Sequence, residues 1–388
     1  MRWRGAWWRL ALLWLAGNDL RLTLLAVPPV LPIIHADLRL DEKGVAALSG
    51  LPVLLLGIAA VPGSLLIARV GARNALLTGL GLIGFSSGLR GFGPSVPMLF
   101  GMTLLMGAGV SISQPTMPSL VRQWFHEPRA IARATGFWSN GLLVGELLAA
   151  ALTLPVVLPL TGSWEASFGF WAVPVLLTAV LVGAGTRGDQ LGKDLPRVLG
   201  MPDWRSARMW RLGIFQSAAS MVYFGANTFI PDYLHATNQA DLVGLALASL
   251  NGMQVPASAV IGFVPLRLLA RPSVSYAVGV GILVALVAAL LFPGIPLVLA
   301  AGLLGFFAAY ILVLSFAMPA LVAPPREVAR LSGGTFAISY STAFVATLIA
   351  GALWDATHLE AFAFLPALAG AAIVIALGPR LVSSALHS

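Results

Sequence analysis

The sequence contains no cysteine and very little charge. None of its 388 residues is Cys, and Asp, Glu, Lys and Arg together make up only 10% of them. The missing cysteines exclude disulfides, thiolate chemistry and cysteine-based metal sites. The scarcity of charge excludes a soluble globule of this length, which would need far more charged side chains to cover its surface.

Motifs for nucleotide and metal chemistry are also missing. The chain has no P-loop, no Gly-rich dinucleotide fingerprint and no HExxH sequence. The histidines are scattered near the ends of apolar runs instead of being clustered as metal ligands: His35, His126, His235, His358 and His387. We therefore expect neither an enzyme nor a cofactor or metal. Any uphill transport would have to draw on an ion gradient or on exchange.

Apolar residues dominate instead, at 58% of the chain and a mean hydropathy of +0.90. A bilayer core of about 30 Å needs roughly 20 apolar residues per helix. Twelve runs of that kind follow one another: 10–34, 45–68, 74–92, 96–120, 131–159, 164–185, 209–234, 240–265, 273–292, 296–320, 332–355 and 361–384. The basic N-terminus leads into the first run without a small-residue cleavage site, so we expect a retained helix. The pattern predicts an all-α membrane protein with twelve transmembrane helices.

The longest polar stretch, residues 186–208, divides the chain in the middle. It predicts an N-terminal six-helix bundle over 1–185, a cytoplasmic linker over 186–208 and a C-terminal six-helix bundle over 209–388.

The net charge of +8 and the pI near 10.7 could indicate nucleic-acid binding. The basic residues, however, lie in short clusters between the apolar runs, as they do in cytoplasmic loops. Most of the 23 fall on one side if the N-terminus is cytoplasmic: Arg2, Arg4, Arg9, Arg69, Arg73, Arg122, Arg129, Arg133, Arg187, Lys193, Arg197, Arg205, Arg208, Arg211, Arg267, Arg271, Arg326, Arg330 and Arg380. We expect a multi-pass protein of a bacterial inner membrane with both termini cytoplasmic. Its expected partners are the lipid bilayer and a small solute, with protons as a further candidate. We expect a monomer that binds no nucleic acid.

Arg21 lies near the middle of the first run. An ionisable group there costs roughly 2.5–3.5 kcal/mol even on the lenient insertion scale, so it marks a functional position. Its permanently charged, planar guanidinium matches carboxylates and other oxyanions. Arg21 is predicted to bind an anionic solute; the alternative is a structural ion pair with an acid on another helix.

Two neighbours of Arg21 lie on different faces of the same helix. Asn18 is three residues away and shares the face of Arg21, whereas Asp19 is two residues away and points about 200° from it, at 100° per residue. Asp19 therefore cannot neutralise Arg21 directly, and it must find a partner elsewhere or line water.

Glu146 is a second charge in the middle of a run, with Ser139 on nearly the same face seven residues before it. It is either a proton carrier or the structural counter-ion of Arg21, and the two roles are compatible. Asp19 is the other proton-coupling candidate. Arg90, at the end of the third run, is expected to snorkel to the interface or to guide anions towards the cavity.

Uncharged polar residues gather in a subset of the runs. They are Ser111, Ser113, Gln114, Gln216, Ser217, Tyr223, Asn227, Asn251, Gln254, Ser339, Tyr340 and Ser341. Each alone is typical of a hydrogen bond between helices, but together they predict a polar cavity. Gly141-x-x-x-Gly145 is expected to be a close-packing motif, and Pro28-Pro29 could be a hinge.

Two six-helix halves joined by a basic loop resemble the major facilitator superfamily. The segment Ser64–Arg73 keeps the Arg69, Gly71 and Arg73 of the superfamily's loop signature, with Ala68 where an Asp is usual and Ser64 where a Gly is usual.

More specific matches resemble the cyanate permease family, which includes nitroimidazole exporters. Asn18, Leu20 and Arg21 followed by Pro28 and Pro32 resemble its first helix. Further matches follow in order along the chain: Gly109, Gln114, Pro118 and Arg122; Thr135-Gly136-Phe137-Trp138; Gly162, Trp164 and Trp171; Gln216, Tyr223 and Pro231-Asp232-Tyr233; Ser332-Gly333, Tyr340 and Asp355.

The resemblance implies that Arg21 and Gln114 face the solute. We expect the cavity to be shaped by polar and aromatic side chains: Asn18, Gln114, Trp138, Tyr223, Asn227 and Tyr340. Glu146 departs from the family, which has a small residue there. We expect a secondary transporter of a small anionic solute that works by alternating access. The alternative is a proton-coupled exporter of neutral or cationic drug-like compounds, with Glu146 as its main site.

Overall fold

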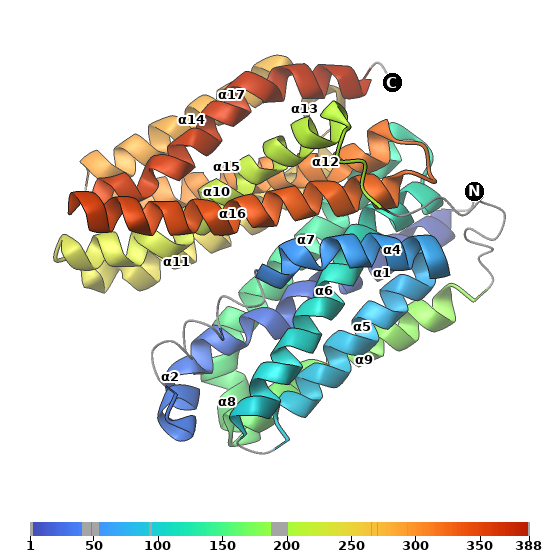
Figure 1. Ribbon diagram of the computed structural model, residues 1–388, viewed down its shortest axis with the longest axis horizontal. Coiled ribbons are helices and arrows are strands. Elements are labelled where there is room, and N and C mark those ends of the chain that lie inside the picture. Colours follow the sequence, from blue (N-terminus) through green and yellow to red (C-terminus); the bar gives the residue numbers. More distant parts are fainter. Residues whose placement is uncertain are drawn as a thin grey trace. The chain divides into compact units, whose positions relative to one another are not determined.

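A computed structural model describes residues 3–40, 48, 54–92, 95–187, 201–264, 266–269, 271–292 and 294–386. These residues form helices joined by short connections, and no strand occurs among them (Figure 1). The chain divides into two compact units. Unit 1 comprises Met1–Phe125, Phe137–Pro202 and Pro324–Gly333; unit 2 comprises His126–Gly136, Asp203–Ala323 and Gly334–Ser388. Most of the expected linker, 188–200, lies outside the described residues, as does much of the start of the second apolar run.

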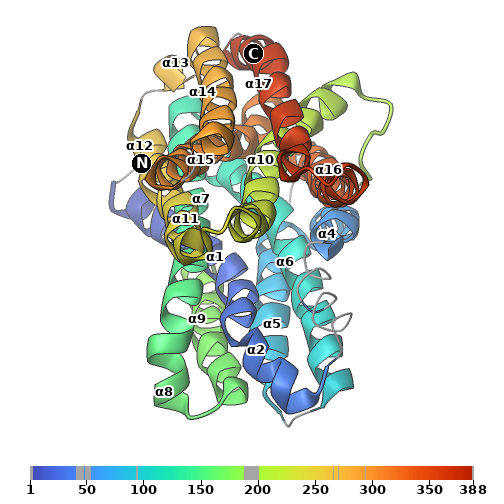
Figure 2. The ribbon, with the colours of Figure 1, turned by 90° about the vertical axis from the view of Figure 1, so that its left-hand side faces the viewer.

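The N-terminal half of the chain contains these helices in order: α1 Trp3–Leu25, α2 Val27–Leu38, α4 Ala60–Val70, α5 Ala72–Arg90, α6 Val96–Trp124, α7 Pro128–Leu152, a π-helical turn Thr153–Val157, α8 Leu158–Thr161 and α9 Trp164–Gly185. Within unit 1, α5 lies between α6 and α9 (Figures 1 and 2).

The C-terminal half contains α10 Ala207–Ala236, a 3₁₀ turn Ala240–Leu242, α11 Val243–Gly252, α12 Gln254–Phe263, α13 Leu266–Leu269, α14 Pro272–Leu291, α15 Ile295–Val322, α16 Val328–Thr357, a 3₁₀ turn Glu360–Phe364 and α17 Leu365–Leu386. Within unit 2, α17 packs against α10 and α14, and α15 packs against α10, α11, α12 and α14.

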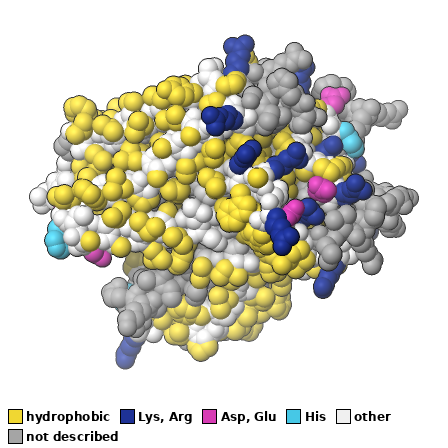
Figure 3. Space-filling view, turned by 45° about the horizontal axis from the view of Figure 1, so that its top comes forward, with side chains coloured by type: hydrophobic (Ala, Val, Ile, Leu, Met, Phe, Trp, Pro, Cys, Tyr) yellow, Lys and Arg dark blue, Asp and Glu magenta, His cyan; other side chains and the backbone are white. Residues whose placement is uncertain are grey.

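Nine helical segments of the described chain are long and apolar enough to cross a bilayer, and α4 is a shorter apolar helix. They coincide with the predicted runs, which confirms the all-α membrane fold. Large apolar side chains stay exposed along them, such as Val180 at 67% and Val284 at 60%. In the space-filling view hydrophobic side chains cover much of the visible face, and most visible Lys and Arg side chains gather towards one side of it (Figure 3). An apolar outer surface of this kind is what a bilayer solvates.

Two interruptions of the long segments lie just before a proline, although α6, α9, α10 and α15 continue through prolines of their own. The first apolar run is divided between α1 and α2 at Ala26, immediately before Val27 and the Pro28-Pro29 pair. The run 240–265 is divided between α11 and α12 at Met253, three residues before Pro256. Proline has no backbone N–H and its ring crowds the carbonyl four residues earlier, so a regular helix cannot pass through it unchanged.

Candidate functional site

The polar turn of α1 is buried inside unit 1. The exposed fractions are 7% for Asn18, 2% for Asp19 and 7% for Arg21. Apolar neighbours on the same helix, Leu20 and Leu22, are also buried, so this part of α1 is enclosed on all sides. A helix buried all round in a membrane protein turns its polar groups towards other helices or an internal space rather than towards lipid.

Small residues hold α7 directly against this turn. A Cβ atom added to Gly141 would collide with the backbone carbonyl of Trp14, and one added to Gly145 would collide with that of Asn18. On the other side of the contact, a Cβ on Gly17 would collide with the carbonyl of Trp138. The predicted packing role of the Gly141-x-x-x-Gly145 motif is therefore confirmed.

A hydrogen bond fixes the register of the same two helices. The indole Nε1 of Trp14 donates to Oδ1 of Asn140 at 3.0 Å. Together with the glycine contacts, this bond places Trp138 and Glu146 on α7 at the level of the α1 polar turn. Trp138 is fully buried and Glu146 is 7% exposed. The structure thus gathers Asn18, Arg21, Trp138 and Glu146 along one helix pair.

Asp19 faces a third helix. The hydroxyl of Thr178, on α9, is the hydrogen-bond partner of the Asp19 carboxyl group. This partner agrees with the helical geometry that turns Asp19 away from Arg21. The second carboxyl oxygen of Asp19 and the amide nitrogen of Asn18 have no hydrogen-bond partner among the described residues. Unsatisfied buried polar atoms of this kind are rare in folded proteins and commonly indicate a place where water, an ion or a solute binds.

Gln114 and Ser139 are two further polar groups of unit 1 that the sequence indicates. Both are buried, Gln114 in the Pro-containing part of α6 and Ser139 on α7. The hydroxyl of Ser139 has no hydrogen-bond partner within the described part of the chain.

Arg90 occupies a different environment from the one expected. Its side chain is fully buried, so it does not snorkel to an interface. Its Nη2 donates to the backbone oxygen of Thr23 at 2.9 Å and to Oγ of Ser87 at 3.0 Å. Its guanidinium carbon lies 4.4 Å from the ring centre of Phe168, which is a cation–π contact. Arg90 thus ties together α1, α5 and α9, and its burial gives no support to a role in guiding anions.

Unit 2 contains a neutral amide network that α10, α11 and α12 build together. Tyr223 donates its hydroxyl proton to Oδ1 of Asn251 at 2.9 Å. Nδ2 of Asn251 donates to Oδ1 of Asn227 at 3.1 Å and to the backbone oxygen of Leu247 at 2.9 Å. Nε2 of Gln254 donates to Oδ1 of Asn251 at 3.4 Å. The predicted residues Tyr223 and Asn227 are therefore brought together through Asn251. We call Tyr223, Asn227, Asn251 and Gln254 the amide network.

An aromatic group continues from the amide network towards α16. The ring of Phe224 lies 5.2 Å from Tyr223 and 6.4 Å from Tyr340, edge to face in both cases. Tyr340 is stacked on Phe336 at 6.1 Å, and Ser220 and Ser339 share a hydrogen bond of 2.9 Å nearby on the same two helices. The third predicted residue of this unit, Tyr340, thus joins Tyr223 through an aromatic chain.

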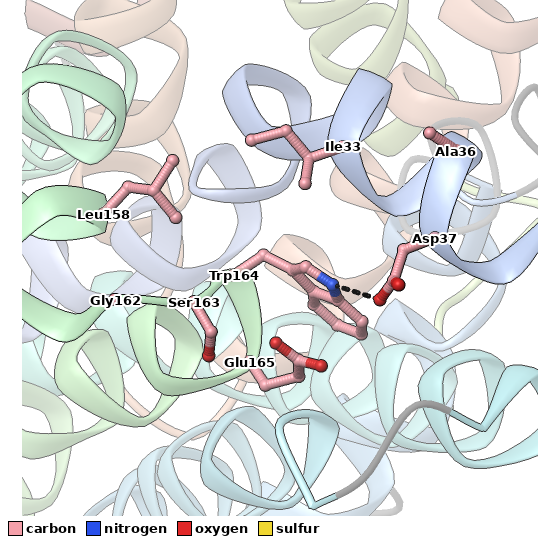
Figure 4. A pocket seen from close by; sticks show the side chains of 8 residues that line it. All are labelled: Ile33, Ala36, Asp37, Leu158, Gly162, Ser163, Trp164 and Glu165. Atoms are coloured by element: carbon pink, nitrogen blue, oxygen red, sulfur yellow. Dashed lines mark hydrogen bonds between the residues drawn. The ribbon is translucent and has the colours of Figure 1, made fainter.

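A cavity of about 590 Å³ in unit 1 is lined by none of the residues of the α1 polar turn (Figure 4). Its wall comes from the end of α2, from α8 and from the start of α9: Ile33, Ala36, Asp37, Leu158, Gly162, Ser163, Trp164 and Glu165. Nε1 of Trp164 donates to the carboxylate of Asp37 at 3.0 Å, as the dashed line shows. None of the sequence-predicted site residues lines it. Within the described chain, no group of three or more His, Cys, Asp or Glu residues could hold a metal ion.

Sequence reasoning gave Asn251 and Gln254 as polar residues of a span but not as site residues, and it missed Thr178. The spacing of Asn251 and Gln254 was a usable signal, since residues three apart share a helix face. Thr178 carried no such signal, because one hydroxyl in an apolar run is typical of any membrane helix.

The comparisons with known proteins agree with this architecture. The sequence profile of the Major Facilitator Superfamily matches residues 13–272, so the chain belongs to that superfamily. Membership implies twelve transmembrane helices, which confirms the predicted number. It also confirms that the chain is a multi-pass membrane protein of a transporter family rather than an enzyme.

Two of the relatives come from Escherichia coli (strain K12). The cyanate transport protein CynX is 31% identical over 240 residues, which are 62% of this chain and 62% of CynX. The 2-nitroimidazole transporter is 26% identical over 256 residues, which are 65% of this chain and 63% of that protein. The matched region therefore spans less than two thirds of either relative. The resemblance to cyanate permeases and nitroimidazole exporters is confirmed.

Solved structures share the fold. The transporter FucP in its outward conformation has a TM-score of 0.76 at 13% identity, covering 96% of this chain and 98% of FucP. The human organic anion transporter MFSD10 has a TM-score of 0.70 at 14% identity, covering 97% of this chain and 99% of MFSD10. At such low identity these likenesses establish the fold alone.

Proposed function

We propose that this protein is a secondary active transporter that carries a small anionic solute across a bacterial inner membrane by alternating access, as a monomer with both termini in the cytoplasm. The proposal rests on Arg21. This permanent cation lies on α1, its side chain is only 7% exposed, and the chain belongs to a superfamily of transporters. A guanidinium binds oxyanions through charge-assisted, bidentate hydrogen bonds, so an arginine inside a membrane helix is suited to hold the anionic group of a solute during transport.

Neighbouring groups of unit 1 support this role. The amide nitrogen of Asn18, one turn before Arg21, is a buried donor with no partner among the described residues. Gln114 and Trp138 would complete the binding surface of the N-terminal bundle, residues 1–185. Tyr223, Asn227 and Tyr340 would contribute from the C-terminal bundle, residues 209–388, with the linker 186–208 between them.

Proton coupling by Glu146 is the second part of the proposal. Glu146 directly follows Gly145, the residue packed on the Asn18 carbonyl, so a carboxyl group lies one residue from the α1 contact. Ionisable side chains inside membrane helices commonly belong to solute pathways or proton relays, and Glu146 is such a side chain. Glu146 also favours the alternative function, a proton-coupled exporter of neutral or cationic drug-like compounds. A relative with the name probable multidrug-efflux transporter, 27% identical over 197 residues, supports this alternative.

Ligand stabilisation of the purified protein tests the proposal. The probes are cyanate, nitrate, acetate, pyruvate and oxamate as anions, and tetraphenylphosphonium as a lipophilic cation. At least one anion should raise the melting temperature of the wild type and of the control R187A, whose arginine is exposed at the end of α9. The same anion should not stabilise R21Q. Equal stabilisation of R21Q, or stabilisation by the lipophilic cation alone, would contradict the proposal.

A further inference from the structure

The segment that leads into α10, in unit 2, contains two Trp–Arg pairs, Trp204-Arg205 and Trp210-Arg211. All four side chains are exposed, with exposed fractions of 41% for Trp204 and 43% for Trp210. The centres of the two indole rings lie 6.3 Å apart, and Nε1 of Trp210 donates to the backbone oxygen of Trp204 at 2.8 Å. Each arginine directly follows one of these contacting tryptophans. We call the four residues the Trp–Arg surface.

Hydrogen bonds hold this segment in a defined conformation. Oγ of Ser206 caps α10 by accepting from the backbone N–H of Met209 at 3.4 Å. The backbone N–H of Arg205 donates to Oδ1 of Asp203 at 3.2 Å. Met209 is buried, so the first turn of α10 is anchored in unit 2 while the next residue, Trp210, faces outwards. A ligand that binds here meets a surface that is already formed, which lowers the entropy cost of binding.

The three arginines of this segment differ in their partners. Nη1 of Arg208 donates to the backbone oxygen of Val322 at 3.2 Å, at the end of α15, where a cation stabilises the last carbonyl groups of a helix. The guanidinium groups of Arg205 and Arg211 have no hydrogen-bond or ion-pair partner among the described residues. These two cations are therefore available to a ligand from outside the protein.

A related sequence begins the first half of the chain. Trp8-Arg9-Leu10 in α1 corresponds to Trp210-Arg211-Leu212 in α10. In α1, the guanidinium carbon of Arg9 lies 5.7 Å from the ring centre of Trp124, which is a cation–π contact within unit 1. The same triplet thus turns its arginine towards the protein in one half and leaves it exposed in the other.

The Trp–Arg surface borders an apolar face of α10. Ile214 is four residues after Trp210, so it shares the helix face of that tryptophan, and it is 37% exposed. Exposed apolar side chains of a membrane helix are solvated by lipid tails, and tryptophans at the end of such a face lie at the level of the headgroups. Arg211, next to Trp210, is therefore placed where lipid phosphates are found.

Most acidic residues of unit 2 lie at the opposite end of α10. Asp232 is 21 residues after Arg211, which corresponds to roughly 30 Å along a helix. Asp355 belongs to that distant end too, because the ring of the preceding Trp354 lies 6.2 Å from that of Phe229. Within unit 2, the Trp–Arg surface consequently keeps a net positive charge.

We propose that the Trp–Arg surface binds the headgroup of an anionic phospholipid, with Arg205 and Arg211 on its phosphate and the two indole rings at the boundary between headgroup and acyl chains. Planar guanidinium groups match phosphate oxygens, and basic residues next to a membrane helix attract anionic lipids. The paired rings favour a lipid over a soluble phosphate, which would gain nothing from them. This site is separate from the solute site proposed above and does not depend on Arg21.

The test removes both cations, by R205Q together with R211Q. The matched control is R129Q together with R187Q, which removes the same charge from two exposed arginines elsewhere, near the start of α7 and after α9. The probe is dioleoyl phosphatidylglycerol in mixed detergent micelles. Dioleoyl phosphatidylcholine, which has no net charge, and glycerol 3-phosphate, which has no acyl chains, are the comparison ligands. Native mass spectrometry counts the bound molecules and gives the apparent dissociation constant of the first one.

The wild type and the control should bind the first phosphatidylglycerol at least tenfold more tightly than phosphatidylcholine. In the double variant R205Q/R211Q, the apparent dissociation constant for phosphatidylglycerol should rise roughly thirtyfold, which two arginines at about 1 kcal/mol each amount to. R205K together with R211K keeps both charges and should bind within severalfold of wild type. The melting temperature of R205Q/R211Q should stay within a few degrees of wild type, since neither guanidinium has a partner in the described fold.

Three results would contradict the lipid site. An equal loss of affinity in R129Q/R187Q would show that net charge alone attracts the lipid. Equal binding of glycerol 3-phosphate would assign the surface to free phosphate, and equal affinity of the wild type for phosphatidylcholine would exclude recognition of the anionic headgroup. If R205Q/R211Q does not fold, the single variants R205Q and R211Q decide the question, with an expected loss of about fivefold each.

Discussion

At the scale of single residues, the chain uses buried arginines in two different ways. Arg21 lies in the polar turn of α1, three residues after an amide donor that has no partner among the described residues. Arg90 contacts a backbone carbonyl and a hydroxyl through Nη2 and an aromatic ring through its guanidinium face. The two environments predict different consequences when the residues are changed, one functional and one structural.

The contact of Arg90 with Phe168 should contribute to stability. We expect a double-mutant cycle of R90M and F168L to give a coupling free energy of about 2 kcal/mol, because a desolvated cation–π contact is lost in either single variant. Chemical unfolding of the purified protein in detergent measures it. Simple additivity of the two substitutions would show that the ring does not stabilise the guanidinium, and F168Y, which keeps an aromatic face, is the control.

Gly145 should tolerate no side chain. Its added Cβ collides with the backbone of α1 at Asn18, and backbone atoms cannot move aside as a flexible side chain can. We expect G145A to lower the free energy of unfolding by about 1–3 kcal/mol. G101A is the control, because a Cβ there meets nothing within 4 Å. Equal melting temperatures for the two variants would contradict the helix contact.

Much of the residue-level picture follows from the sequence, and the exceptions have a physical cause. Helical geometry alone predicts that Asp19 turns away from Arg21, but not that it meets Thr178, because that contact depends on which face of α9 packs on α1. The burial of Arg90 was not predictable either. A position at the end of an apolar run normally allows snorkelling. Here Phe168 and the backbone of Thr23 offer the guanidinium partners inside the bundle.

At the scale of elements, two apolar runs that hydropathy predicts as single helices are divided just before a proline. Hydropathy predicts the runs 10–34 and 240–265 as continuous spans, since it measures composition and not hydrogen bonds. The structure divides them at Ala26 and Met253, next to Pro28-Pro29 and before Pro256. The predicted run boundaries agree well with helix ends elsewhere, because loops must satisfy their backbone in water and contain the charged residues.

Restoring the missing backbone N–H should straighten the broken segments. We expect P256A and P62A each to raise the free energy of unfolding by about 1 kcal/mol, through one recovered hydrogen bond to Gly252 or Ile58. Transport should slow at unchanged solute affinity, since a helix that cannot bend resists alternating access. Thermal unfolding and uptake kinetics measure the two effects.

The control for these variants is P97A. Pro97 lies in the first turn of α6, where a backbone N–H has no intrahelical partner in any case. The P97A substitution should change neither the free energy of unfolding nor the transport rate. If P256A and P62A transported solute as fast as P97A, the breaks would have no part in the conformational cycle.

At the scale of the whole molecule, the two units offer different chemistry. Unit 1 has buried charges on α1 and α7, and unit 2 has neutral amides and stacked aromatic rings on α10, α11, α12 and α16. The predicted site residues of the two units therefore differ in kind, since only those of unit 1 include charged side chains.

The absence of cysteine makes the membrane orientation directly measurable. A single cysteine at Phe92, 80% exposed after α5, should react with a membrane-impermeant maleimide in intact cells, because the positive charges predict this connection to be outside. A cysteine at Arg187 should react only after the cells are opened. Labelling of R187C in intact cells would reverse the predicted topology.

The measurement that bears most directly on this account is solute uptake by proteoliposomes that contain either wild type or R21A. The solute is the anion that stabilises the wild type, and equal reconstitution of R21A and of R187A is checked by gel and by melting temperature. We expect R187A to transport at the wild-type rate and R21A to lose uptake at least a hundredfold, since removing a charge-assisted bidentate contact costs about 3 kcal/mol or more. Uptake by R21A at the wild-type rate would show that the buried guanidinium of α1 does not bind the solute.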